Sequence, residues 1–311
     1  MKVILLLISL ALAAFGPASA SGQDTVRIGL SVRNVVLMPF YFAQDKGFFE
    51  KEGLKAEIIQ IRSNLQVAGV VAGELDFMSG VGTAIDAIRK GLPLKVVAVL
   101  YKAPLFSLVT GTSINRLREL EGKKVGVSRI GSESHNAAVW MLTQNGVDVK
   151  KITFIQTGST TVSMIGLQQS SLEASVLSPP FTGEMVLQGF KVLAKTGDVV
   201  EAPFNGLATS RDRLRSRPER IRGTLKAMLD SFRRIKQDRR GTIEYIQQSF
   251  KVNSKIAENS YNEITEVMLD NLIMPEDRLK KAMDSPYARG EGEKSVSVND
   301  VVDYSILRSL R

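Results

Sequence analysis

The stretch Gly122–Trp140, GKKVGVSRIGSESHNAAVW, predicts a strand that passes directly into a helix. Lys124–Ser128 has the apolar pattern of a buried strand, Gly131 interrupts it, and the residues that follow carry helix-start signals. The first N–H groups of a helix lack partners and carry partial positive charge, so this junction can bind an anion or a polar ligand head. The alternative is that Ser132 only caps the helix, which contributes about 1 kcal/mol.

Strands and helices alternate on both sides of this stretch. Helices separate most of the predicted strands, which are 25–32, 54–61, 76–79, 94–101, 124–128, 152–156, 173–177, 192–194 and 205–210. This alternation predicts an α/β fold with mainly parallel sheets, each flanked on both faces by helices. Beyond Arg211 the pattern is nearly all helix, over 218–237, 241–250, 254–271, 276–284 and 300–310.

The two halves of the chain each contain a similar short segment, and we call this repeated pattern the internal echo. Gly73–Ser79 (GELDFMS) and Ser170–Ser178 (SSLEASVLS) each contain a leucine followed by an acid, then a short strand. Each leads into a loop of small residues or prolines that starts a helix. In an open α/β sheet, ligands bind beyond the carboxyl ends of the strands. We therefore expect two lobes whose loops face each other across a cleft.

Residues 1–20 are predicted to be a cleaved signal peptide. Lys2 is followed by the apolar run Val3–Phe15 and by the small residues Ala18-Ser19-Ala20, with cleavage expected near Ala20. The apolar run is too short to span a bilayer. The mature chain is therefore expected to be exported, and its length suggests two domains or one two-lobed body.

The composition excludes several kinds of chemistry. The 311 residues include no cysteine and one histidine, so a disulfide framework and a thiolate nucleophile are excluded, and neither a cofactor nor a metal site is predicted. The formal net charge of +9 can attract anionic solutes or an anionic membrane surface. Export argues against nucleic acid as a partner. The basic run Arg211–Arg240 has apolar residues at helical spacing, so we interpret most of its arginines as lying on the solvent-exposed face of a helix.

The run Pro39–Leu54 (PFYFAQDKGFFEKEGL) resembles the P-x-x-x-A-x-x-x-G-x-F-x-x-x-G-L signature of substrate-binding proteins of ABC importers. The branch it resembles is the nitrate/sulfonate/taurine type (SsuA/THI5-like, NMT1-like domain). The segments Gly73–Asp76, Leu120–Val125 and Pro218-Glu219 also resemble that family. The resemblance implies a two-lobed periplasmic binding protein type II fold with a helical C-terminal extension.

The same resemblance implies a domain organisation and partners. Lobe 1 would comprise 21–106 and 207–311, lobe 2 would comprise 107–206, and the hinge crossings would lie near 103–113 and 202–210. A bacterial protein of this kind is expected in the periplasm, as a monomer that delivers a small solute to an inner-membrane ABC permease.

The family's ligand loops correspond to four segments of this chain: the turn after the first strand, the loop before the helix at 83–90, the junction at 128–135, and the loop before the helix at 181. The residues that the resemblance implies for ligand binding are Ser31, Arg33, Asn34, Gly82, Thr83, Ser128, Arg129, Gly131, Ser132, Glu133, Ser134, His135, Pro180 and Phe181. Structural readings stay open as well, because Gly82 could serve only the turn, Thr83 could be a plain N-cap, and Pro180 could merely start its helix.

The charges in these loops point in two directions. Arg33 and Arg129 would suit a carboxylate or a sulfonate. Glu133 would repel a ligand anion at the same place, and it could instead pair with Arg129 or meet the amine of a zwitterion. The solute is therefore expected to be anionic, zwitterionic or heteroaromatic.

Enzyme motifs are incomplete, and no catalytic residue is predicted. Gly126–Gly131 has one residue too many for a G-x-S-x-G elbow, and Gly80–Ile85 lacks the third glycine of a dinucleotide fingerprint. The remaining alternatives are an enzyme like the pyrimidine synthases of the same fold, whose cysteine-rich motif a chain without cysteine lacks, and an exported sensor for a membrane receptor. His135 is then expected to line the cleft or cap a helix.

Overall fold

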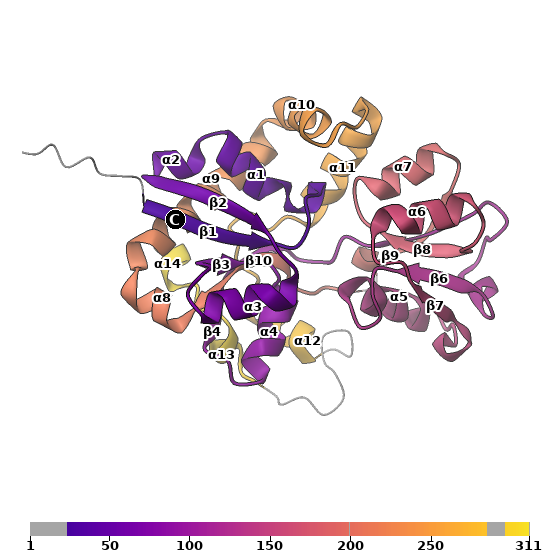
Figure 1. Ribbon diagram of the computed structural model, residues 1–311, viewed down its shortest axis with the longest axis horizontal. Coiled ribbons are helices and arrows are strands. Elements are labelled where there is room, and N and C mark those ends of the chain that lie inside the picture. Colours follow the sequence, from indigo (N-terminus) through magenta and orange to yellow (C-terminus); the bar gives the residue numbers. More distant parts are fainter. Residues whose placement is uncertain (1–23, 199, 285–295, 311) are drawn as a thin grey trace, which may run out of the picture.

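The computed structural model describes residues 24–198, 200–284 and 296–310, which form two lobes, each built around a five-stranded sheet (Figure 1). The predicted signal peptide lies outside the described residues. In lobe 1 the strand order is β2-β1-β3-β10-β4, with β1 (Asp24–Leu30), β2 (Leu54–Gln60), β3 (Phe77–Met78), β4 (Leu94–Tyr101) and β10 (Phe204–Ser210). In lobe 2 it is β7-β6-β8-β5-β9, with β5 (Ser107–Thr110), β6 (Lys124–Val127), β7 (Thr153–Gln156), β8 (Ala174–Leu177) and β9 (Lys191–Lys195).

Both sheets have the same mixed topology, which confirms the predicted two-lobed α/β fold. The strand β10 is antiparallel to both of its neighbours in lobe 1, β5 is antiparallel to both of its neighbours in lobe 2, and the other pairs are parallel. Sequence patterns do not predict β5, because four residues lying within a proposed crossing show no clear period. The chain passes from the first sheet to the second over 102–106 and returns over 196–203.

Helices flank each sheet (Figure 1). Lobe 2 carries α5 (Glu133–Gln144), α6 (Thr160–Gln168) and α7 (Phe181–Leu187). Lobe 1 carries the N-terminal helices α1 (Met38–Asp45), α2 (Phe48–Lys51), α3 (Ser63–Val71) and α4 (Val81–Arg89). The C-terminal extension adds α8 (Arg211–Ser216), α9 (Pro218–Gln237), α10 (Arg239–Phe250), α11 (Ser254–Val267), α12 (Glu276–Asp284), α13 (Val298–Val301) and α14 (Ser305–Arg308).

Two C-terminal helices differ from their prediction, and the cause is the free edge of β4. The predicted helix 254–271 stops at Val267, because the chain becomes extended and Leu269 N donates to Leu100 O at 2.9 Å. The predicted helix 300–310 is split into α13 and α14, because Asp303 N donates to Val96 O at 2.9 Å. The unpaired backbone carbonyl groups of the edge strand β4 accept hydrogen bonds from both segments.

The core of lobe 1 is one large cluster that joins the sheet to the C-terminal helices, so these helices complete that lobe. Phe40, Tyr101 and Phe232 are among its largest fully buried side chains. Lobe 2 has two smaller clusters, one containing Leu108 and the other Val109. Because successive residues of a strand face opposite sides, these two clusters lie on opposite faces of the sheet.

The internal echo in the sequence has a packing role in each lobe. Leu75 fills the contact between the strand β1 and the helix α3, where a Cβ added at Gly29 or Gly69 would lie 2.9 or 3.0 Å from Leu75 Cδ1. In lobe 2, Leu172 takes the same place between β6 and α6, where a Cβ at Gly126 or Gly166 would lie 2.7 or 2.6 Å from Leu172 Cδ1. We call Leu75 and Leu172 the leucine wedges.

The acid next to each wedge bonds the neighbouring strand. Asp76 Oδ2 accepts a hydrogen bond from Arg27 N at 2.8 Å, and Glu173 Oε2 accepts one from Lys124 N at 3.0 Å. Asp76 also pairs with Arg213 at 2.5 Å and Arg220 at 3.1 Å, which ties β3 to the C-terminal extension. Some arginines of the basic run are therefore partly buried ion-pair partners rather than residues on a solvent-exposed helix face.

The leucine wedge of lobe 2 can be tested with a double-mutant cycle. We expect Gly166→Ala to lower the free energy of unfolding by about 1–3 kcal/mol, because the new methyl group overlaps Leu172 and the overlap outweighs the helix-propensity gain of about 1 kcal/mol. Leu172→Ala should cost about 2–5 kcal/mol. The double variant should cost clearly less than the sum, because the added methyl fills part of the space that the leucine leaves.

Urea unfolding measures all three variants. Gly183→Ala is the matched control, because its Cβ would meet Ile256 alone, at ordinary distances of 3.6 Å to Cγ2 and 4.0 Å to Cα. Additive losses in the cycle would show that the glycine and the leucine are not in contact.

Candidate functional site

The first three strands of lobe 1 end side by side. Ile61 N donates to Leu30 O at 2.8 Å and Ser79 N to Gly29 O at 3.1 Å, so the loops after β1, β2 and β3 share one edge. Gln66, which is fully buried, holds two of these loops together. Its Oε1 accepts from Ser79 N at 3.1 Å and its Nε2 donates to Ile61 O at 2.8 Å.

The corresponding edge of lobe 2 carries three serine hydroxyls in mutual contact. The Oγ of Ser134 lies 2.8 Å from that of Ser128 and 3.0 Å from that of Ser132, and the latter two are 3.1 Å apart. Ser132 precedes α5, but its side chain makes no capping bond; its Oγ donates to Arg129 O at 2.6 Å. Gly131, with φ of +76°, makes the turn that a side chain would disfavour.

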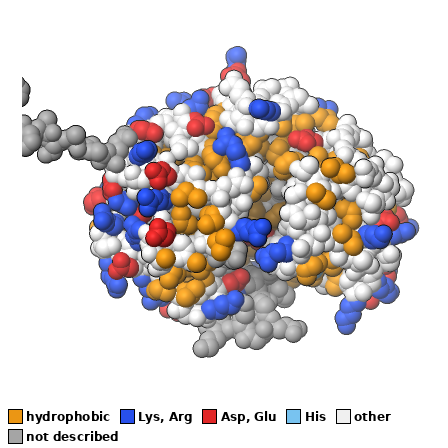
Figure 2. Space-filling view, in the orientation of Figure 1, with side chains coloured by type: hydrophobic (Ala, Val, Ile, Leu, Met, Phe, Trp, Pro, Cys, Tyr) orange, Lys and Arg blue, Asp and Glu red, His pale blue; other side chains and the backbone are white. Residues whose placement is uncertain are grey.

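These two edges meet where the first turn of α5 lies against the first turn of α4. Glu133 Oε1 lies 3.6 Å from the position that a Cβ would take at Gly82, so the junctions of opposite lobes are in contact. In Figure 2 the surface is hollowed along the boundary between the lobes. Thr83 sits inside the first turn of α4, whose N-cap is Gly80, so the N-cap interpretation of Thr83 is wrong.

Glu133 is the charged group at this meeting point. More than a third of the residue is exposed to solvent, and its Oε1 faces Gly82 of the opposite lobe. Desolvation raises the pKa of Glu133 to about 7, and the negative charge of Asp86 on α4 adds to the rise. Arg129 forms no ion pair with Glu133, so a direct pair does not neutralise this carboxylate.

The loop after β1 is held by α1 and α10. Ser31 and Arg33 are exposed, and the Arg33 guanidinium lies over the rings of Tyr41, at 4.2 Å, and Phe250, at 5.8 Å. Asn34 is buried, and its Oδ1 accepts from Leu37 N at 3.0 Å to cap a short 3-10 turn. Arg33 is therefore presented at the surface, while the Asn34 oxygen already has a local partner.

The remaining predicted residues lie within lobe 2. The His135 ring packs edge-on against Phe154 of β7, with centroids 4.7 Å apart, and desolvation lowers the pKa of its imidazole. Pro180 is buried directly before α7, and Phe181 is partly buried against the core cluster of α6 and α7. The geometry of His135 and Phe181 thus favours packing, whereas Ser128, Ser132 and Glu133 stand at the lobe boundary.

The loops after β2 and after β7 lie at the same edges and carry no predicted residue. The loop after β7 joins the one after β6, because Gly158 N donates to Ser128 O at 3.0 Å. Leu65, at the start of α3, and Val162, in the first turn of α6, are 49% and 50% exposed, so each presents an apolar side chain at these edges. The rule that ligands bind at carboxyl ends of strands applies to every parallel strand and was the available signal.

The described residues contain no group of three or more His, Asp or Glu side chains placed to hold a metal ion. Within these same ranges, no helix has the length and hydropathy needed to cross a bilayer.

Two α/β lobes of like topology, joined by two crossings and meeting at their strand ends, define the periplasmic binding protein fold. The NMT1/THI5 like family profile matches residues 34–239, and the chain belongs to this family. Among solved structures, the chain is similar to the alkanesulfonate-binding protein SsuA from Xanthomonas axonopodis pv. citri bound to MOPS. That similarity has a TM-score of 0.70 at 15% identity and covers 84% of this chain and 91% of that one.

Curated relatives include a binding protein and an enzyme. The chain is 24% identical over 233 residues to the riboflavin-binding protein RibY of Chloroflexus aurantiacus, which covers 70% of this chain and 64% of that protein. It is 26% identical over 93 residues to 4-amino-5-hydroxymethyl-2-methylpyrimidine phosphate synthase of Schizosaccharomyces pombe, covering 29% of this chain and 27% of the enzyme. The chain thus spans less than two thirds of the length of these relatives.

The raised pKa of Glu133 predicts a pH dependence of stability. A carboxyl whose pKa is higher in the folded state than its usual 4.5 stabilises the fold while protonated, so this contribution is present at low pH and lost as the pH rises through about 7. The unfolding temperature should therefore fall between about pH 5 and pH 8, and Glu133→Gln should reduce the fall.

Thermal unfolding of the unmodified protein and of Glu133→Gln across this pH range provides the comparison. All other carboxyls titrate in both proteins, so the difference between the two curves isolates Glu133. Parallel curves would mean that the group is well solvated and does not feel the opposite lobe.

Proposed function

We propose that this protein is the solute-binding component of an ABC importer, which captures a small molecule between its lobes and delivers it to an inner-membrane permease. The observation that carries the proposal is the meeting of the α4 and α5 N-termini at Gly82 and Glu133, from opposite lobes. Unpaired helix amides and the serine hydroxyls supply polar groups at that place. Family membership supports the same function, because one similar structure is named as the ligand binding component of an ABC-type import system and another as an alkanesulfonate-binding protein.

Binding in this proposal works by hinge closure. Contacts that need both lobes at once favour the closed form only when solute is present, so ligand shifts the population toward closure. A micromolar dissociation constant corresponds to about −8.2 kcal/mol. A few charge-assisted hydrogen bonds of about 1.5–3 kcal/mol each, with apolar burial, supply this against the cost of ordering. Leu65 and Val162 are candidate apolar walls.

The position of Glu133 narrows the choice among solutes. An anion at the α4 and α5 N-termini would face its carboxylate, and Asp86 lies nearby. A solute that presents an amine or a ring N–H to Glu133 would instead gain a charge-assisted hydrogen bond. Arg129, which is exposed, remains available for a carboxylate or sulfonate elsewhere on the same molecule. We therefore favour a zwitterionic or heteroaromatic solute over a simple anion.

A carrier fits the local chemistry better than an enzyme. The serine hydroxyls contact one another, and the chain's single imidazole packs on Phe154, so these hydroxyls have no base beside them among the described residues. The alternative of a pyrimidine-synthase-like enzyme is tested by turnover, and that of a receptor-docking sensor by its membrane partner. We propose a periplasmic location and a monomeric state for the carrier.

Mass spectrometry of the mature protein under native conditions, followed by calorimetry, tests the binding proposal. We expect a co-purified small molecule, and we expect a panel of taurine, an alkanesulfonate, riboflavin and a hydroxymethylpyrimidine to contain a compound that binds with micromolar affinity. The bound compound should be recovered unchanged. Binding of none of the panel, with no co-purified molecule, would contradict the proposal.

The two arginines should respond differently to neutralisation. Arg129→Met is expected to weaken binding of the identified solute by about tenfold or more without changing the unfolding temperature, because Arg129 has no side-chain partner in the described structure. Arg33→Met should also lower the unfolding temperature, because it removes the stacking on Tyr41. Calorimetry and thermal unfolding separate the two effects, and equal losses of stability in both variants would show that Arg129 is structural.

A further inference from the structure

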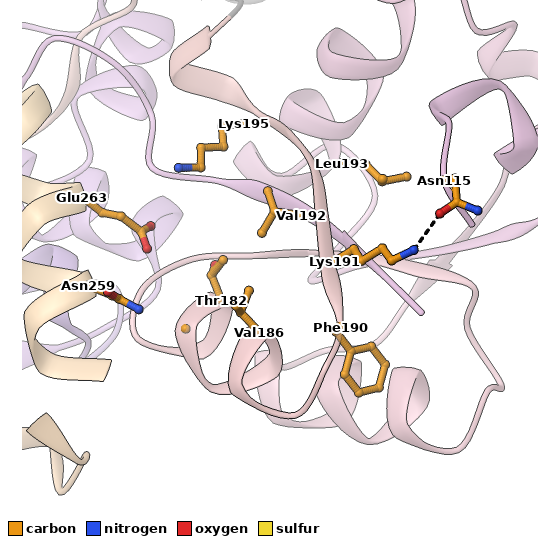
Figure 3. Close-up of a pocket in the computed structure, with 11 residues that line it drawn as sticks. Asn115, Thr182, Val186, Phe190, Lys191, Val192, Leu193, Lys195, Asn259 and Glu263 are labelled. Carbon is orange, nitrogen blue, oxygen red and sulfur yellow. Dashed lines mark hydrogen bonds between the residues drawn. The ribbon is translucent and has the colours of Figure 1, made fainter. Parts of the chain in front are cut away.

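A cavity of about 520 Å³ lies between α7 and β9 of lobe 2 and α11 of lobe 1 (Figure 3). We call it the α7–α11 cavity. No predicted ligand residue lines it. Its size is within the range of small-molecule sites, which is about 300–1,000 Å³. Its walls come from both lobes, with Gly183 of α7 in contact with Ile256 of α11.

Three polar side chains without a hydrogen bond or ion pair in the described chain line this cavity, namely the Asn259 amide, the Lys195 ammonium and the Glu263 carboxylate. Figure 3 shows Lys195 and Glu263 extending toward each other from opposite lobes. Because the ammonium and the carboxylate form no direct ion pair, the space between them can hold a ligand with complementary charges.

The charges and the apolar wall together indicate the ligand class. Lys191, the second lysine in the wall, turns away and donates to Asn115 Oδ1 at 2.6 Å, so one ammonium and one carboxylate remain for a ligand. Lys195 and Glu263 offer opposite charges from the two lobes, and Phe190 and Val186 add apolar surface. A single-charge ligand would leave one of these groups unmatched, whereas a zwitterion matches both.

We propose that the α7–α11 cavity is a second binding site, which takes a small zwitterion with an apolar stem, such as an apolar α-amino acid. Its carboxylate bonds Lys195, its ammonium bonds Glu263, and Asn259 completes the polar contacts. Because the ligand bridges β9 and α11, its occupancy couples to the relative position of the lobes. This site is independent of the solute proposed for the strand-end loops.

Burial and charge at Glu263 agree with this arrangement. Desolvation raises the pKa of Glu263, the charge of Lys195 opposes that rise, and the charge of Glu266 adds to it. A bound ammonium would favour the ionised carboxylate, so binding should strengthen as the pH rises through the pKa of Glu263.

Calorimetry with L-leucine on the full mature protein tests the proposal, with isopentylamine and 4-methylpentanoate as analogues that each lack one charge. We expect leucine to bind and each analogue to bind at least about tenfold more weakly. Lys195→Met and Glu263→Gln should each weaken leucine binding by about tenfold or more. Asn259→Leu should weaken it by about threefold to tenfold, because it removes the amide that bonds the ligand.

A matched control on α11 makes the result specific. Lys255→Met removes the same charge as Lys195→Met from an exposed position that does not line the α7–α11 cavity, and leucine affinity should stay within about twofold. The proposal is overturned if leucine gives no binding heat, if both single-charge analogues bind as well as leucine, or if Ser132→Ala abolishes leucine binding while Lys195→Met does not. The last result would place leucine at the strand-end loops.

Discussion

The leucine wedges are the contact on which the arrangement of both lobes depends. Each wedge sits between a glycine of an inner strand, β1 or β6, and a glycine of the helix that precedes the wedge, α3 or α6, and there is no room at those glycines for a Cβ. The acid beside each wedge bonds the N–H of the adjacent strand. Together they set where β3 and β8 begin, and therefore where the loops after them emerge at the sheet edge. The positions of α4 and α7 follow from that.

The second constraint is electrostatic and acts between the lobes. Two helix N-termini that face each other both carry partial positive charge, which favours an acceptor between them. Glu133 stands there in the described structure, yet burial and Asp86 work against its ionisation. A solute that donates a hydrogen bond to Glu133 stabilises the ionised carboxylate against desolvation and the charge of Asp86. Water is less able to do so, because closing lobes exclude it. The same group thereby links solute choice to closure.

Much of the fold could be predicted because its signals are local. The strand 94–101 and the helix 218–237 have the predicted bounds, since apolar period and flanking Pro or Gly determine them. The helix 254–271 was predicted too long, because the pairing of its last residues with β4 is a contact between distant segments. The echo of Leu75 and Leu172 is visible in the sequence, but its contacts with glycines of other elements are not.

The candidate site also combines features set by local sequence with contacts between distant segments. The convergence of Ser128, Ser132 and Ser134 follows from their short spacing around one strand-to-helix turn. The contact of Glu133 with the opposite lobe depends on how the two sheets are placed, which no local pattern encodes. The same holds for the α7–α11 cavity, whose polar groups come from segments far apart in the chain.

The central claim is that the two strand-end edges close on a solute by rotation about the crossings at 102–106 and 196–203. Electron–electron distance spectroscopy tests it directly, because the chain has no cysteine and Lys55→Cys with Lys123→Cys would introduce the only thiols, one exposed in each lobe. The claim predicts that a saturating solute replaces a broad distance distribution with a narrow one at a new mean. An identical distribution with and without a solute that calorimetry shows to be bound would contradict it.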